Sequence, residues 1–310
     1  MSSEGGTKAV VAALAANLGI AVSKFVAFAF TGSSSMLSEA IHSVADSGNQ
    51  VLLLVGNKRS KQPASQLHQF GHGRRRYVYG FMVAIVLFLV GGLFSLYEGL
   101  HKFQHPEVLS DAWIAFAVLI VAIVLESLSF RTAIREANHV RGKRSFPRFL
   151  RDARQPELPV ILLEDLGALV GLVFALTGVT MSVVTGDGRW DGLGAMAVGA
   201  LLIIIAIFLV IEMSAMLVGE SALPEEEAAI RAALTASPLV DRVIHLRTLH
   251  VGPDELLVGA KIAIRESATA AQIAAGIDAA ERSLRAAVPT AKYVYLEPDL
   301  DRLAGEANPG

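Results

Sequence analysis

Long apolar runs dominate the first 220 residues and end abruptly before the last ninety. Six runs are about 20 residues long or longer, which is the length that an α-helix needs to cross a hydrocarbon core about 30 Å thick. The six runs cover approximately residues 9–31, 35–56, 77–100, 111–130, 158–184 and 193–218. The pattern therefore predicts six transmembrane helices, of which the second and the fifth differ from the rest because acidic residues interrupt them.

From Leu223 onward, shorter alternating patterns replace the apolar runs. Pro224 and the three glutamates after it indicate the start of a helix, because proline suits the first helical position and acidic side chains favour that end of the helix dipole. Ser267 is expected to cap a second helix. The predicted order is helix, strand, strand, helix, strand, at 224–235, 240–251, 256–264, 268–288 and 292–296.

These patterns predict two domains. Residues 1–220 are expected to form a multi-pass α-helical membrane domain of six transmembrane helices, and residues 221–310 a cytoplasmic αββαβ domain. We expect the second domain to serve dimerisation or regulation, because nothing in it resembles a catalytic constellation.

Charge is scarce and unevenly distributed. Only 18% of the 310 residues are charged, against about 25% in an average soluble domain. The loops after the second and fourth predicted spans carry fourteen Lys or Arg residues, and the other loops between spans carry two. Because cytoplasmic loops are enriched in basic residues, both termini are predicted to be cytoplasmic, with the bacterial plasma membrane as the location. The net charge of −2 gives no indication of nucleic-acid binding.

The second predicted span contains a candidate metal-binding pair. His42 and Asp46 are four residues apart and so lie on one helical face, one turn from each other. The chain has no cysteine, so further ligands must carry nitrogen or oxygen. Glu164 and Asp165 in the fifth span are the best candidates. A carboxylate at the bilayer centre costs roughly 2.5–3.5 kcal/mol, so these side chains are expected to face the bundle interior.

The same residues allow a different interpretation. A buried hydrogen-bond network, for example with His42 paired to Asp165, needs no ion at all. We favour a metal site because one pair would satisfy such a network, whereas at least four ionisable groups occur on the two spans.

Four segments resemble the cation diffusion facilitator family of divalent-metal transporters. They are SMLSEAIHSVADSGNQ, QFGHGRRR, LLEDLGALVGL and VGESALPEEE. The resemblance covers nearly the whole chain and implies a homodimeric antiporter that exchanges a divalent cation, most often zinc, for protons, with no cofactor and no enzymatic activity. It also implies a transport site made of two residues four apart on the second span and two more on the fifth.

Carried over residue by residue, the resemblance assigns His42, Asp46 and Asp165 as ligands, whereas Ile161 occupies the place of the expected histidine. Glu164 lies about 100° around the helix from Asp165, so it can complete the shell only if the helix is distorted or rotated, and water is the simpler fourth ligand. The segments SEAIHS and LLED resemble the zinc transporter 9 branch, which lacks the same histidine. An oxygen-rich shell leaves manganese or another divalent cation as alternative substrates.

Three further expectations concern the loops, the tail and the overall function. His68 and His72 match a second, weaker metal site of the family, although a polar loop without metal is equally consistent with the sequence. His245 and His250 are expected to be ordinary strand residues on opposite faces. The alternative to transport is a membrane scaffold or metal sensor with a degenerate site, which Ile161 favours.

Overall fold

The computed structural model describes residues 3–264 and 267–300, with side chains from residue 17 onward, and the chain divides into two compact units. The first unit comprises residues 1–59 and 76–214. The second combines residues 60–75 with the chain from residue 215 onward. The loop of residues 60–75 therefore belongs with the C-terminal unit, which the hydropathy pattern did not indicate.

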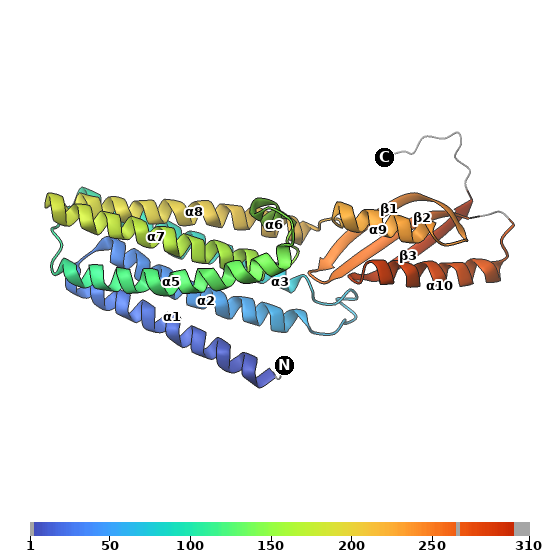
Figure 1. The fold of residues 1–310 in the computed structure, drawn as a ribbon, viewed down its shortest axis with the longest axis horizontal. Helices are drawn as coiled ribbons and strands as arrows, with labels where there is room; N and C mark the ends of the chain where they lie inside the picture. Colours follow the sequence, from blue (N-terminus) through green and yellow to red (C-terminus); the bar gives the residue numbers. More distant parts are fainter. Residues whose placement is uncertain (1–2, 265–266, 301–310) are drawn as a thin grey trace. The chain divides into compact units, whose positions relative to one another are not determined.

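The first unit is a bundle of long helices (Figure 1). Each of the six predicted spans corresponds to a helix, and a short π-helical segment, η1, joins two helices into one continuous span. The elements are α1 (Ser3–Thr31), α2 (Ser34–Ser60), α3 (Arg75–Val86), η1 (Leu87–Leu93), α4 (Phe94–Gln104), α5 (Ala112–Arg141), α6 (Phe146–Asp152), α7 (Glu157–Thr185) and α8 (Arg189–Val218).

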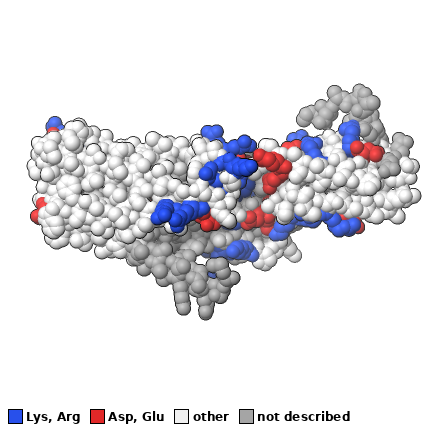
Figure 2. Space-filling view, in the orientation of Figure 1, with Lys and Arg blue, Asp and Glu red and all other residues white. Residues whose placement is uncertain are grey.

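Four of these helical stretches in the described part of the chain are long and apolar enough to cross a membrane: Arg75–Gln104, α5, α7 and α8. The apolar part of α1, Asn17–Thr31, is shorter, and α2 is 27 residues long but rich in polar side chains. On the face shown in Figure 2, the surface of the bundle is free of charge along most of its length. The chain is therefore a multi-pass helical membrane protein, and α2, which is more polar than its other long bundle helices, carries His42 and Asp46.

Small residues let the helices approach each other closely. A Cβ atom on Gly99 would lie 2.6 Å from both the carbonyl oxygen of Gly192 and the backbone nitrogen of Met196, so α4 and α8 meet backbone to backbone. A Cβ on Gly178 would lie 3.1 Å from Cα of Gly194, which joins α7 to α8 in the same way. Such contacts are typical of helix packing in membranes.

Replacing Gly99 by alanine is expected to destabilise the bundle. The added methyl group must push α4 away from the α8 backbone, and overpacking of this kind costs typically 1–3 kcal/mol. The matched control is Gly19→Ala on α1, where nothing lies within 4 Å of the new Cβ and alanine favours the helix. Thermal unfolding of the protein in detergent should show a lower midpoint for Gly99→Ala alone; equal midpoints for the two variants would contradict this packing.

The second unit has the predicted αββαβ order. Its elements are α9 (Pro224–Thr235), β1 (Val240–Gly252), β2 (Glu255–Ile264), α10 (Ala270–Ala287) and β3 (Ala291–Leu300). The sheet order is β1-β2-β3, with β2 antiparallel to β1 and parallel to β3. Both helices bury apolar side chains against the sheet, including Ile230 and Leu234 from α9 and Leu284 from α10. The fold class predicted for the tail is confirmed.

The start of α10 differs from the prediction. Thr269, not Ser267, is the capping residue: its Oγ1 accepts a hydrogen bond from the Gln272 backbone N–H, and Gln272 Oε1 accepts one from the Thr269 N–H. This capping box requires Glu or Gln three residues after the capping residue. The residue three positions after Ser267 is Ala270, which cannot form it. The short helix α6 was also not predicted, because seven residues are too few to show a helical period in the spacing of apolar residues.

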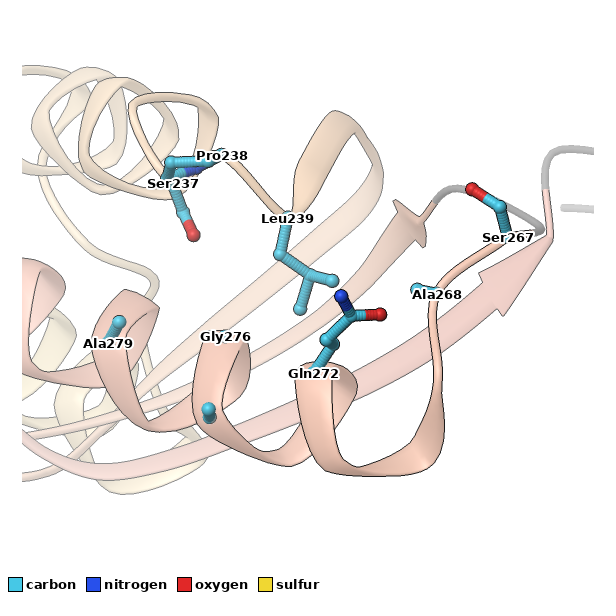
Figure 3. Close-up of a pocket in the computed structure, with 9 residues that line it drawn as sticks. Ser237, Pro238, Leu239, Ser267, Ala268, Gln272, Gly276 and Ala279 are labelled. Atoms are coloured by element: carbon cyan, nitrogen blue, oxygen red, sulfur yellow. The ribbon is translucent and has the colours of Figure 1, made fainter.

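A groove of about 430 Å³ lies in the second unit between α10 and the chain just before β1 (Figure 3). Leu239 packs over Gly276, where a Cβ would meet the leucine side chain at 2.4 Å. None of the described residues that line the groove is ionisable. The described part of the groove wall therefore offers a packing surface without an acidic or basic side chain.

Candidate functional site

A row of polar side chains follows α2 on the face buried in the bundle. Glu39, His42, Asp46 and Asn49 are separated by three, four and three residues, so they share one helical face. Glu39, His42 and Asn49 are buried, and the Asp46 side chain is 17% exposed. Burying polar groups costs free energy unless they have hydrogen-bond or ionic partners. The contacts of these four side chains therefore show which of them can bind a ligand.

His42 and Asp46 form the centre of the stripe. Nε2 of His42 lies 3.4 Å from Oδ2 of Asp46, as their spacing predicted. Neither ring nitrogen of His42 makes a hydrogen bond to any described residue, and the same holds for Oδ1 of Asp46. Buried polar atoms normally have hydrogen-bond partners, so an imidazole and a carboxylate left this way are available to a cation.

Glu164 approaches this stripe from α7. Its side chain is buried, and Oε1 accepts a hydrogen bond of 2.6 Å from Nδ2 of Asn49. Seven residues further along α7, a Cβ on Gly171 would lie 2.9 Å from Oε1 of Glu39. The face of α7 that contains Glu164 and Gly171 therefore faces the polar stripe of α2.

Asp165 lies on a different side of α7. Its Oδ2 accepts a hydrogen bond of 3.0 Å from Oγ of Ser129 on α5, about one helical step of 100° away from the Glu164 direction. Ile161, one turn before Asp165, is 36% exposed. The structure thus brings His42, Asp46 and Glu164 toward one region and directs Asp165 toward α5. Metal ligation by any of these residues stays a prediction.

The side chains of His42, Asp46 and Glu164 do not meet at one point in this conformation. Among the described residues, no three His, Asp or Glu side chains are close enough together to hold a metal ion. His42 and Asp46 form a ready pair, whereas Glu164 is held by Asn49 one turn further along the stripe. A three-ligand shell therefore requires Glu164 to leave Asn49 and turn toward Asp46.

A π-helical segment lies beside the pair. A Cβ on Gly91, within η1, would lie 3.9 Å from Nδ1 of His42. Single π-helical turns inside α-helices occur frequently at functional sites. The apolar pattern did not predict this segment; the consecutive glycines at Gly91 and Gly92 in an apolar span were the available signal.

Comparison with known proteins shows the family of the chain. A family model described as the cation efflux transmembrane domain matches residues 10–218. The chain belongs to the cation efflux family. Members of this family are transporters and not enzymes. The resemblance recognised in the sequence is therefore confirmed.

Two relatives show the extent of the similarity. Human "Proton-coupled zinc antiporter SLC30A9, mitochondrial" is 34% identical over 244 residues, which are 78% of this chain and 43% of that protein. The cation-efflux pump FieF of Pectobacterium atrosepticum is 27% identical over 254 residues, covering 81% of this chain and 79% of that one. The chain thus spans less than half the length of the zinc antiporter.

The first helix of this cation efflux protein contributes a residue that the sequence analysis missed. Nζ of Lys24 lies 2.9 Å from Oε2 of Glu39 and 2.8 Å from Oγ of Ser43, and the whole side chain is buried. A lysine in the middle of an apolar run was the available signal, because charges inside membrane spans are rare and usually functional.

The loop histidines lie in the second unit. The ring centroids of His68 and His72 are 4.6 Å apart, and Nδ1 of His72 lies 3.4 Å from the Gln62 carbonyl oxygen. Phe70 between them packs edge-on against Tyr293 of β3, with 5.2 Å between centroids. The two imidazoles are thus paired, and a second metal site at this loop stays a prediction.

The two tail histidines differ in exposure. His245 is exposed and His250 is buried, which agrees with their predicted placement on opposite faces of β1.

Proposed function

We propose that this protein transports a divalent cation, zinc first, across a membrane in exchange for protons. The observation that carries the proposal is the pair of His42 and Asp46, whose ring nitrogens and Oδ1 have no hydrogen-bond partner among the described residues and are available to a cation. Glu164 of α7 lies beside Asn49, one helical turn after Asp46 on α2. Family membership and the name of the human relative, a proton-coupled zinc antiporter, support the same activity.

The proposed site holds the transported metal through His42, Asp46 and Glu164, with water as the fourth ligand. One nitrogen and two carboxylates suit tetrahedral zinc. Asn49 holds Glu164 through its amide, and this hydrogen bond must break when Glu164 binds the metal. Because the ligands must be deprotonated to bind metal, metal and protons compete for the same atoms, and this competition couples their movement.

The remaining parts of the proposal concern assembly and location. We propose a homodimer, joined through the C-terminal unit, that alternates between two openings of the helical bundle. The basic loops support termini on the cytoplasmic side, and a bacterial plasma membrane supplies the proton gradient that the exchange needs. The human relative, by contrast, is named as a mitochondrial protein.

The test uses purified protein in liposomes loaded with a zinc dye and a pH dye. We expect an acidic interior to drive zinc inward, and zinc entry to release protons outward in step with it. Protein-free liposomes are the control, and manganese and cobalt compete in parallel assays. Zinc entry at a rate independent of the pH gradient, with no accompanying proton movement, would overturn antiport. Zinc binding without any uptake would favour the scaffold or sensor alternative.

A further inference from the structure

Lys24 brings a positive charge into the centre of the bundle. It belongs to the apolar stretch Asn17–Thr31 of α1, and its side chain is completely buried. Its amine donates hydrogen bonds to the side chains of Glu39 and Ser43, which both belong to α2. An ammonium group at such depth is costly in a membrane protein, so its placement against α2 calls for an explanation.

The amine lies on the same polar stripe as the proposed metal ligands. Glu39 precedes His42 by three residues and Ser43 follows it directly, so the two acceptors of Lys24 flank His42 along the helix. Lys24 is also close enough to His42 and Asp46 to interact electrostatically with both. Its charge therefore acts on the site where the metal is proposed to bind.

Glu39 is a buried carboxylate that could bind a metal ion, but one of its oxygens already pairs with Lys24. It continues the stripe of His42 and Asp46, and its Oε1 makes no hydrogen bond within the described residues. Its other oxygen, Oε2, is held by Lys24 at 2.9 Å. Without the lysine, the buried carboxylate and the nearby Ser43 hydroxyl would offer oxygen ligands to a divalent cation, and zinc accepts carboxylate oxygen as a ligand.

We propose that the ammonium group of Lys24 pairs with Glu39 in place of a metal ion, so that the transported metal can bind only at His42 and Asp46. This inference rests on the proposed function. It assigns Lys24 the role of a positioning residue that sets how many metal ions the bundle holds. A purely structural ion pair would only fasten α1 to α2, and the two roles predict different metal binding.

The first test counts bound zinc in purified protein equilibrated with a zinc buffer. We expect Lys24→Met to bind one more zinc ion per chain than the unaltered protein, because Glu39 becomes free to ligate. The double variant Lys24→Met/Glu39→Gln should lose that additional ion. The matched control is Lys102→Met, which removes another buried amine whose Nζ bonds to the Gly32 carbonyl, and the zinc count should not change.

The second test compares zinc affinities and does not depend on the folding of Lys24→Met. In Glu39→Gln the ammonium loses its counter-charge, so it repels the metal at His42 and Asp46. We expect this variant to bind zinc at least about tenfold more weakly than Lys24→Met/Glu39→Gln, in which the charge is gone. Size-exclusion chromatography confirms that both proteins are folded.

The outcomes separate this inference from the function it rests on. Unaltered protein that binds no zinc through His42 and Asp46 would contradict the proposed function. Normal zinc binding there, with equal zinc counts in Lys24→Met and unaltered protein and equal affinities in the two Glu39 variants, would overturn the role of Lys24 alone. If Lys24→Met aggregates, the affinity comparison decides.

Discussion

Replacing Asp46 by asparagine is expected to reduce zinc uptake into proteoliposomes by at least about 100-fold. Asparagine keeps the size and polarity of the side chain, but it removes the negative charge that faces His42 at 3.4 Å. Loss of an outer-shell partner alone typically costs 10–100-fold in metal affinity or activity, so loss of a direct ligand should cost at least as much. The initial rate of zinc uptake under an imposed pH gradient measures the effect.

The control for this variant is Asp152→Asn on α6. Asp152 pairs with Arg148 at 3.2 Å on the surface, and exposed pairs contribute about 0–1 kcal/mol. We expect its uptake to equal that of the unaltered protein. If Asp46→Asn retained more than half of the uptake of this control, Asp46 would not be a ligand of the transported metal.

The second large effect distinguishes the two acidic neighbours on α7. We expect Glu164→Gln to abolish uptake as Asp46→Asn does, because Glu164 faces α2 and supplies the second carboxylate. Glutamine still offers an oxygen to Asn49, so the variant keeps its packing. Asp165→Asn likewise keeps an oxygen for Ser129 and should retain uptake within about tenfold, because Asp165 faces α5.

The resemblance to the family predicts the reverse order, since it assigns Asp165 as the ligand on the fifth span. Paired measurements of zinc affinity and uptake for Glu164→Gln and Asp165→Asn separate the two assignments. An inactive Asp165→Asn beside an active Glu164→Gln would mean that α7 turns by about 100° in the metal-bound protein.

The architecture was predictable because it depends on patterns along the chain. Apolar runs of membrane-spanning length located the helices of the bundle, and alternation located β1 and β2. The pairing of His42 with Asp46 was predictable for a similar reason, because a separation of four residues on one helix fixes their proximity. Such features need no knowledge of how helices pack against each other.

The choice between Glu164 and Asp165 could not be made from the sequence. It depends on the rotation of α7, which packing sets: a Cβ on Gly167 would meet Ile205 of α8 at 2.8 Å, and one on Gly171 would meet Glu39 of α2 at 2.9 Å. Lys24 was missed for a related reason, because a single charge in an apolar run does not reveal which partner it meets.

The central claim is that the transported metal binds between α2 and α7, and anomalous X-ray scattering from zinc-soaked crystals tests it most directly. Data collected above and below the zinc edge locate the ion without reference to any assumed ligand. We predict a peak about 2.0–2.2 Å from one ring nitrogen of His42 and from carboxylate oxygens of Asp46 and Glu164. A peak beside Asp165, or zinc found only at His68 and His72, would contradict the account.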